Sequence, residues 1–163
     1  MKKVVLLLGS NLDDRRNYLL KACQQIAYVI GQITKYSKIY ETKSWGFDSF
    51  PFLNQVVEVE TKLQPEQVLQ AIETIEVQLG RLDKTHKNEE GVPIYHDRTI
   101  DIDILLYENY CCTTSRLTIP HAQMTNRTFV LQPLAELYED TIIPPFQRSF
   151  KDLLNDLQHL QNK

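Results

Sequence analysis

The sequence of 163 residues predicts an α+β fold with the element order βαββαβ. Three observations lead to this class. Valine alternates with glutamate in 52-FLNQVVEVET-61, as in a strand of an antiparallel sheet. The segments 19–30 and 69–79 carry apolar residues at helical spacing. The segment 98-RTIDIDILLY-107 is rich in β-forming aliphatic residues, with two aspartates among them.

The chain begins with a predicted strand and helix. Residues 4–8 are continuously apolar and end at Gly9, which indicates a strand that runs into a turn. Asp13 or Asp14 can cap the following helix, and Gly31 ends its apolar stripe. These signals together predict a βα unit.

Two further strands are expected next. The segment 33–46 is rich in β-branched and aromatic residues, which predicts a strand and then a loop near 43–49. In the segment 52–61, Glu58 and Glu60 share one face and the valines share the other. This pattern is typical of a half-exposed antiparallel strand.

The second half of the chain adds helices and a long loop. Pro65 suits the first turn of a helix that Gly80 ends, and the polar segment 81–97 after it is expected to be a mobile loop. Residues 129–137 continue the core, and Ser149 can cap a final amphipathic helix. The prediction is therefore one domain over residues 1–163: a ferredoxin-like sandwich with helices on one face of an antiparallel sheet, and extra C-terminal strand and helix elements.

Composition limits the partners. The formal net charge is −3 with both signs interspersed, unlike proteins that bind nucleic acid through its backbone. No apolar run approaches the ~18 residues of a membrane span. We therefore expect a cytoplasmic monomer that acts on small molecules and binds neither nucleic acid nor membrane. Its three cysteines, Cys23, Cys111 and Cys112, are expected to be reduced thiols.

Two acids in an aliphatic strand need an explanation, because a buried carboxylate is costly unless it is paired or metal-bound. Side chains alternate along a strand, so Asp101 and Asp103 share a face, with Cα atoms about 6.6 Å apart. The other face is expected to pack under the helices through Ile100, Ile102, Ile104 and Leu106. Oxygen-only ligands at this spacing favour magnesium, although an edge strand with two solvated acids is the simpler alternative.

Basic residues lie in the sequence on both sides of the aspartates. They are Arg81, Lys84, Lys87 and Arg98 before the pair, and Arg116 and Arg127 after it. Arginines beside a metal ion suit a transferring phosphoryl group, although each one alone is more often a solvated surface residue. His121 could donate to a phosphate or be an ordinary loop histidine. The phosphate-binding pattern GxxxxGK[ST] is absent from the sequence.

Four residues could together bind a flat heterocycle. The rings of Trp45, Phe52 and Phe129 can stack on such a ligand, and Asn54 can hydrogen-bond to its polar edge. Without further context, aromatic residues of this kind are more often part of the core.

The combination of motifs resembles the hydroxymethyldihydropterin pyrophosphokinase family of folate biosynthesis. The resemblance spans nearly the whole chain and rests on LGSNL, YET with WG, FLNQVVEVET, the GR after the second helix, DRTIDIDILLY, LTIPH and NRTFVLQPL. It implies transfer of pyrophosphate from ATP to the hydroxymethyl group of 6-hydroxymethyl-7,8-dihydropterin, with release of AMP. It also implies the ferredoxin-like fold.

The resemblance implies a role for each matching residue. Asp101 and Asp103 would hold two magnesium ions, and Arg81 and Arg98 would bind the transferring group. The ATP site would be formed by Glu76, Arg98, Ile104, Arg116, Thr118, His121 and Arg127. The pterin site would be formed by Thr42, Lys43, Trp45, Phe52, Asn54 and Phe129.

The chain also departs from the family pattern. The loop 82–97 is longer than usual, and it lacks the tryptophan and paired arginines that are common there. Ala122 follows His121 where an aromatic residue is common, and Phe52 stands where tyrosine is frequent. We expect these changes to alter contacts made by the loop and one contact to the nucleotide, but not the chemistry.

Two other functions fit parts of the sequence. RNA-recognition domains share the βαββαβ order, but their third strand is basic and aromatic, whereas this one reads VVEVE. His96, His121 and Asp101 could form an iron site with two histidines and one carboxylate, as in oxygenases. That reading gives no role to Asp103 or the arginines.

Overall fold

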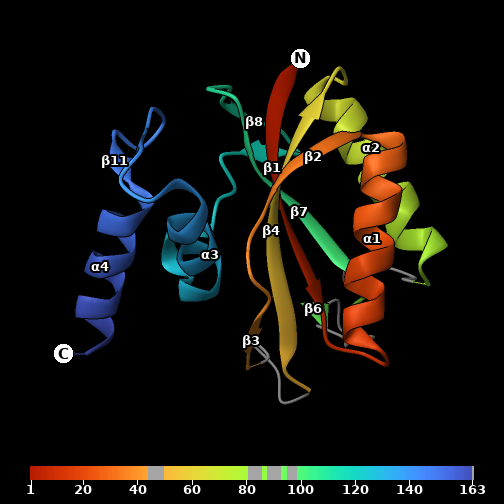
Figure 1. Ribbon diagram of the computed structural model, residues 1–163, viewed down its shortest axis with the longest axis horizontal. Coiled ribbons are helices and arrows are strands. Elements are labelled where there is room, and N and C mark those ends of the chain that lie inside the picture. Colours follow the sequence, from red (N-terminus) through yellow and green to blue (C-terminus); the bar gives the residue numbers. More distant parts are fainter. Residues whose placement is uncertain (44–49, 81–85, 88–92, 95–98, 163) are drawn as a thin grey trace.

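The computed structural model describes residues 1–43, 50–80, 86–87, 93–94 and 99–162. Its centre is a five-stranded antiparallel sheet of order β2-β4-β1-β7, with β3 paired to β4 (Figure 1). The strands are β1 (Lys2–Ser10), β2 (Gly31–Tyr36), β3 (Tyr40–Thr42), β4 (Phe52–Thr61) and β7 (Asp101–Tyr107). The predicted α+β class and element order are confirmed.

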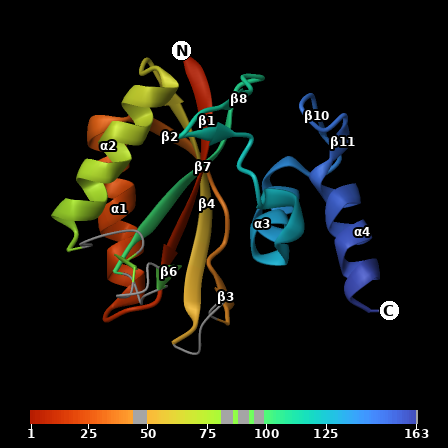
Figure 2. The ribbon, with the colours of Figure 1, turned by 180° about the vertical axis from the view of Figure 1, so that it is seen from behind.

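Helices lie on both faces of this sheet. Helices α1 (Arg15–Val29) and α2 (Pro65–Gln78) cover one face, as predicted. Helix α3 (Thr128–Tyr138) covers part of the opposite face, and α4 (Phe150–Gln161) packs on the outer side of α3 (Figure 2). The C-terminal elements therefore form a second helical layer.

Short elements complete the chain. They are β5 (His86–Lys87) and β6 (Pro93–Ile94), β8 (Cys112–Thr113) and β9 (Thr118–Ile119), the 3-10 helix η1 (Met124–Asn126), and β10 (Ile142–Ile143) and β11 (Arg148–Ser149). Each of the three short strand pairs is antiparallel. The expected loop 81–97 thus contains one strand pair, and its other residues lie outside the described part.

The helix boundaries follow the signals in the sequence. Of the two candidate caps of α1, Asp14 accepts a hydrogen bond from the Asn17 N–H. Helix α2 begins at Pro65, as expected, and is followed by Gly80 with φ +94°. Ser149 caps α4 by accepting the Asp152 N–H. Gly31 is required because a Cβ there would lie 1.9 Å from the Glu60 carbonyl oxygen.

The strand expected in 33–46 is divided into β2 and β3, which pair with successive parts of β4. The division falls at buried Ser37, whose N–H donates to the Val56 carbonyl. In return, the Ser37 hydroxyl accepts the Val56 N–H. A side chain thus replaces one bond of the ladder, which periodicity alone did not indicate.

The half-exposed character expected for β4 is wrong at Glu58. This residue is 4% exposed because it lies opposite Val5, on the face that α3 covers. Its carboxylate accepts hydrogen bonds from Tyr138 Oη (2.6 Å) and Thr34 Oγ1 (2.9 Å). A buried carboxylate is tolerated here because both of its oxygens have donors.

The alternation expected along β7 holds only up to Ile104. Val5 lies opposite Leu106 while the next residue, Leu6, lies opposite Ile104, so Leu105 is the extra residue of a β-bulge. Leu105 and Leu106 both pack on the α3 side. The expectation that Leu106 shares a face with Ile104 is therefore wrong, because a bulge reverses the alternation.

The cysteines are unpaired, as expected. All three cysteines are free, and burial raises the pKa of the Cys23 thiol to about 11. Within the described residues, no helix combines the length and the apolarity that a membrane crossing needs.

Candidate active site

The strand register brings two predicted site residues to one face of the sheet. Asn54 on β4 lies opposite Gly9 on β1, and Gly9 lies opposite Asp101 on β7. Residues directly opposite one another point to the same face, so Asn54 and Asp101 face the same side. Their Cα atoms are two strand spacings apart, about 10 Å.

Asp103 lies on this same face. It is opposite Leu7, which packs in the apolar cluster beneath α3. Asp101 and Asp103 are half-buried, whereas Ile102 and Ile104 are buried under α1 and α2. The predicted division of this strand into an apolar face and an acidic face is confirmed at these four residues.

Gly9 allows two side chains to approach the strand closely. A Cβ at this position would lie 3.3 Å from Asn54 Oδ1 and 3.5 Å from Phe52 Cδ1. Such contacts are at or below ordinary van der Waals distance, so a larger residue would displace the amide. We infer that the glycine of the LGSN motif leaves room for the Asn54 amide beside β1.

Three of the predicted pterin residues are neighbours. Thr42 pairs with Phe52 in the sheet, and Asn54 Nδ2 donates to Thr42 Oγ1 at 2.7 Å. This bond orients an amide that is only 4% exposed. Lys43 follows Thr42 and is exposed. Trp45, also predicted here, lies outside the described residues.

The start of α3 carries two more predicted residues. Arg127 precedes the helix, with its Cζ 5.7 Å from the centre of the Phe129 ring. Phe129 packs against the same apolar cluster that includes Leu7 and Val56. Since Leu7 is the register partner of Asp103, the structure brings this aromatic residue to the acidic face of the sheet.

Glu76 occupies a different position from the other predicted nucleotide residues. It is 3% exposed, and its Oε2 accepts the Ile102 N–H at 3.0 Å. Strand β7 is at the edge of the sheet, so this carboxylate satisfies a backbone donor on the open side of the strand between the two aspartates. Ile104 contributes its side chain to the core.

His121 is anchored to the bulge in β7. Its N–H donates to the Leu105 carbonyl at 3.0 Å, and its Nδ1 accepts the Gln123 N–H at 3.2 Å. A neutral His121 ring therefore carries its proton on Nε2, the nitrogen suited to donate to a phosphate oxygen. The preceding Ile119–Pro120 peptide bond is cis.

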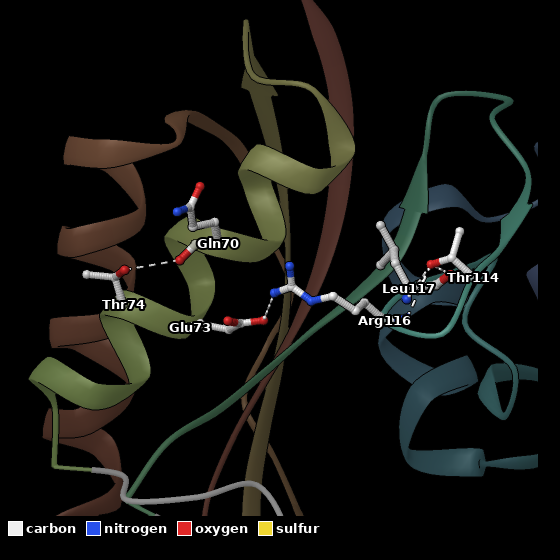
Figure 3. Close-up of polar contacts among 6 residues, drawn as sticks. All are labelled: Gln70, Glu73, Thr74, Thr114, Arg116 and Leu117. Carbon is white, nitrogen blue, oxygen red and sulfur yellow. Dashed lines mark hydrogen bonds and ion pairs between the residues drawn. The ribbon is translucent and has the colours of Figure 1, made fainter.

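Arg116 lies in the turn between β8 and β9. Thr114 Oγ1 accepts the N–H groups of Arg116 and Leu117, at 3.3 and 2.9 Å. The guanidinium extends to α2, where its Nη2 lies 2.9 Å from Glu73 Oε1 (Figure 3). Thr118, at the start of β9, is half-buried and paired with Thr113.

Part of the predicted site cannot be compared with the structure. Arg81, Arg98 and His96 lie outside the described residues. Among the residues that are described, no group of three or more histidine, cysteine, aspartate or glutamate side chains could hold a metal ion. The acidic face thus offers the pair Asp101 and Asp103, which suits a metal that completes its coordination with substrate oxygens.

Sequence reasoning missed the roles of two residues. Gly9 was expected to end a strand and was part of the LGSNL motif, but its place beside Asn54 was not predicted, because the sequence does not show the strand register. Glu73 was not singled out, although it stands three residues before Glu76 and so on the same side of α2.

An edge strand with paired carboxylates, next to an arginine and a histidine that can donate to phosphate, is typical of enzymes that transfer phosphoryl groups. Comparison with known proteins narrows this class. Residues 5–139 match the family described as 7,8-dihydro-6-hydroxymethylpterin-pyrophosphokinase (HPPK). The chain belongs to this family and is therefore a pyrophosphokinase of folate biosynthesis.

Individual relatives agree with the family assignment. A 2-amino-4-hydroxy-6-hydroxymethyldihydropteridine pyrophosphokinase of Porphyromonas gingivalis is 45% identical over 139 residues, which are 84% of this chain and 91% of the relative. One from Aquifex aeolicus is 36% identical over 153 residues, or 93% and 90% of the two chains.

The fold has solved counterparts. A crystal structure of Plasmodium falciparum HPPK-DHPS matches with a TM-score of 0.73 and 16% identity. The match covers 95% of this chain and 45% of that one, so this chain spans less than half of the solved protein. At this identity, the likeness supports the fold alone.

Proposed function

We propose that the protein transfers the pyrophosphoryl group of ATP to the hydroxymethyl oxygen of 6-hydroxymethyl-7,8-dihydropterin and releases AMP, with magnesium as the metal. The observation that carries this proposal is the row Asn54–Gly9–Asp101 across the sheet. Asn54 and Asp101 face the same side of the sheet in this row, about 10 Å apart, which supports a pterin site beside a metal site.

The pterin would bind beside Gly9. Because Asn54 Nδ2 already donates to Thr42, the Oδ1 atom is the group suited to accept a hydrogen bond from the pterin edge. Phe52 and Phe129 would stack on the two faces of the ring. Backbone groups near Lys43 and Trp45 would complete the contacts to the polar edge.

Magnesium fits the donor set of the acidic face. Asp101 and Asp103 supply oxygen ligands only, and a hard cation with one or two carboxylates is usually completed by water and substrate phosphates. When bound, two such ions would neutralise charge on the ATP phosphates. Glu76 would support the aspartates indirectly, because it holds the Ile102 N–H between them.

Basic side chains would position the triphosphate. His121 would donate from Nε2, and Arg116 and Arg127 would bind phosphate oxygens. Arg81 and Arg98 would bind the transferring group, while Thr118 and the backbone of Ile104 would line the nucleotide site. Guanidinium groups are suited to this task because they bind phosphate in a bidentate manner.

The reaction would be an in-line displacement at the β-phosphorus. The hydroxymethyl oxygen forms the new bond to phosphorus, the bridge to the α-phosphate breaks, and AMP leaves with the electron pair. The hydroxyl proton passes to solvent or to a nearby carboxylate. In a loose transition state, positioning and charge stabilisation contribute more than a strong base.

The test is to incubate the protein with ATP, magnesium and the hydroxymethyl dihydropterin, and to quantify AMP and the pterin diphosphate. We expect equal amounts of the two products, and no AMP when the pterin is omitted. Folded protein that forms no AMP with all three components would overturn the proposal.

The two alternative functions have less support. An RNA-recognition domain binds bases on an open sheet face, whereas α3 covers part of this face (Figure 2). Tyr138 of α3 donates a hydrogen bond to the buried Glu58 there. The iron-site alternative requires His96, which lies outside the described residues, and gives no role to Asp103.

A further inference from the structure

The ion pair between Glu73 and Arg116 connects the two elements on either side of the edge strand β7. Glu73 belongs to α2, and Arg116 belongs to the turn between β8 and β9. Figure 3 shows the arginine side chain extending across β7 towards the helix, with 2.9 Å between Nη2 and Oε1. The pair therefore bridges the edge at which the nucleotide is proposed to bind.

The pair is exposed and contributes little to the fold. The side chains of Arg116 and Glu73 are 60% and 47% exposed. Ion pairs with this exposure contribute little net free energy, because water solvates both charges well when they separate. Among the described residues, the Arg116 guanidinium hydrogen-bonds to one side chain, that of Glu73.

Glu76 and Glu73, on the same side of α2, differ in burial and in what they bind. Glu76 is buried, and its carboxylate holds the backbone of β7 at Ile102. Glu73, one turn earlier, is exposed, and its carboxylate pairs with Arg116, a long side chain on an exposed turn. The first contact belongs to the fold, whereas the second can be exchanged for another anion.

A triphosphate is a stronger partner for an arginine than one exposed carboxylate. It carries several negative charges and offers oxygen pairs that match the guanidinium fork. Under the proposed function, Arg116 would leave Glu73 when ATP binds. Breaking the ion pair would then be part of the free energy of nucleotide binding.

We infer that Glu73 is a positioning residue that competes with the nucleotide for Arg116. It holds the guanidinium across β7 in the free protein and thereby sets the affinity for ATP. This inference rests on the proposed function and concerns ATP binding alone, so the pterin and the chemical step do not enter it.

The test is a double-mutant cycle on ATP binding, measured by calorimetry with magnesium in the absence of pterin. We expect Glu73→Gln to lower the dissociation constant about two- to fivefold, the range for an exposed ion pair. Arg116→Ala should raise it. In the Arg116→Ala background, Glu73→Gln should have no further effect on the dissociation constant, because the guanidinium that Glu73 binds is absent.

The matched control is Glu66→Gln, which removes the same charge from the first turn of α2, about 10 Å along the helix. This control separates a specific ion pair from general repulsion between the helix and the nucleotide. An equal gain in Glu66→Gln would overturn the inference, as would a gain that persists without Arg116, or no gain in Glu73→Gln.

Steady-state kinetics gives a second readout. Glu73→Gln should lower the KM for ATP and leave kcat unchanged, since the ion pair is already broken in the bound complex. A fall in kcat would contradict the assignment. If wild-type protein binds ATP but forms no AMP, the proposed reaction fails while the binding cycle still decides the role of Glu73; if it binds no ATP, both proposals fail.

Discussion

The two faces of the central sheet differ in what they bury. The face under α1 and α2 is lined by aliphatic residues such as Leu6, Leu8 and Ile102. The face towards α3 also buries aliphatic residues where that helix packs, among them Val5, Leu7 and Val56. Polar residues share this face with them: Glu58 lies opposite Val5, Asp103 lies opposite Leu7, and Asn54 and Asp101 lie on either side of Gly9.

The polar residues of the second face are stabilised in two ways. Burial alone would raise the pKa of the Glu58 carboxyl, but hydrogen bonds from Tyr138 and Thr34 outweigh this effect. The charges of Lys35 and Lys3 act in the same direction as these bonds, and the resulting pKa lies below the ordinary value. The aspartates stand at half-buried positions, where we propose that they bind metal.

Helix α3 is tied to the sheet by reciprocal pairs of a phenol and a carboxylate. Tyr138 on the helix donates to Glu58 on β4, and Tyr40 on β3 donates to Glu136 on the helix, each at 2.6 Å. Burial, together with the Glu136 hydrogen bond and charge, raises the pKa of Tyr40 to about 12. These contacts orient the helix whose start carries Phe129.

The largest effect is expected from the acidic residues of the open part of this face. Asp101→Asn or Asp103→Asn should lower kcat by about a thousandfold or more, since a lost metal ligand removes several kcal/mol of transition-state stabilisation. Thermal unfolding should change little. Asp140→Asn, an exposed aspartate after α3, is the control. Full activity in both site variants would show that the metal assignment is wrong.

A substitution on the apolar face should lower the free energy of unfolding and leave catalysis unchanged. Leu6 is fully buried under the helices, so Leu6→Ala should cost about 2–5 kcal/mol in the free energy of unfolding. The folded fraction should keep its kcat. Urea denaturation followed by circular dichroism measures the first quantity, and a cost well under 1 kcal/mol would contradict the packing described here.

The contact between Tyr138 and Glu58 should give a smaller, pH-dependent effect. Tyr138→Phe leaves a buried carboxylate with one donor fewer, and should cost about 1–3 kcal/mol at pH 7. Tyr28→Phe, at an 86% exposed position, should cost almost nothing. Chemical denaturation of both variants measures these differences.

The pH dependence has a definite sign. The pKa of Glu58 is lowered in the folded state, so its stabilisation is present above the ordinary carboxyl pKa of about 4.3 and is lost as the pH falls through the folded value. The cost of Tyr138→Phe should therefore shrink near pH 3. A cost that is equal at pH 7 and pH 3 would show that the hydrogen bond does not control this titration.

The smallest effect is expected at Gly9. In Gly9→Ala the new methyl would displace the Asn54 amide by a few tenths of an ångström, which should raise the KM for the pterin several-fold. Stability should fall by less than about 1 kcal/mol. Gly31→Ala is the matched control, because its clash with the Glu60 carbonyl should lower stability without changing the KM. An unchanged KM in Gly9→Ala would separate Asn54 from pterin binding.

Several features could be predicted from the sequence because they depend on neighbouring residues. Asp14 and Ser149 cap helices through their own side chains, and Gly80 ends α2 with a positive φ. The positions of Asp101 and Asp103 on one face follow from strand alternation. Each of these signals is confined to a few residues, so no knowledge of the tertiary structure was needed.

Other features depend on residues far apart in the chain. Glu58 looked exposed because its partner Tyr138 lies 80 residues away. The bulge at Leu105 reverses the alternation through its pairing with β1, and Glu76 reaches the backbone of Ile102 across 26 residues. The ion pair between Arg116 and Glu73 could not be predicted for the same reason, since Glu73 lies 43 residues earlier.

By itself, the sequence determined the order of the elements, the ends of the helices and the acidic face of β7, because periodicity and capping act over a few residues. The tertiary structure decided which polar residues of the sheet lie under α3 and which lie in the proposed site. The cover over Glu58 depends on α3, a helix that packs over β4 from more than 60 residues further along the chain. Its position leaves Asn54 and the two aspartates in the part of the face that we propose binds substrate.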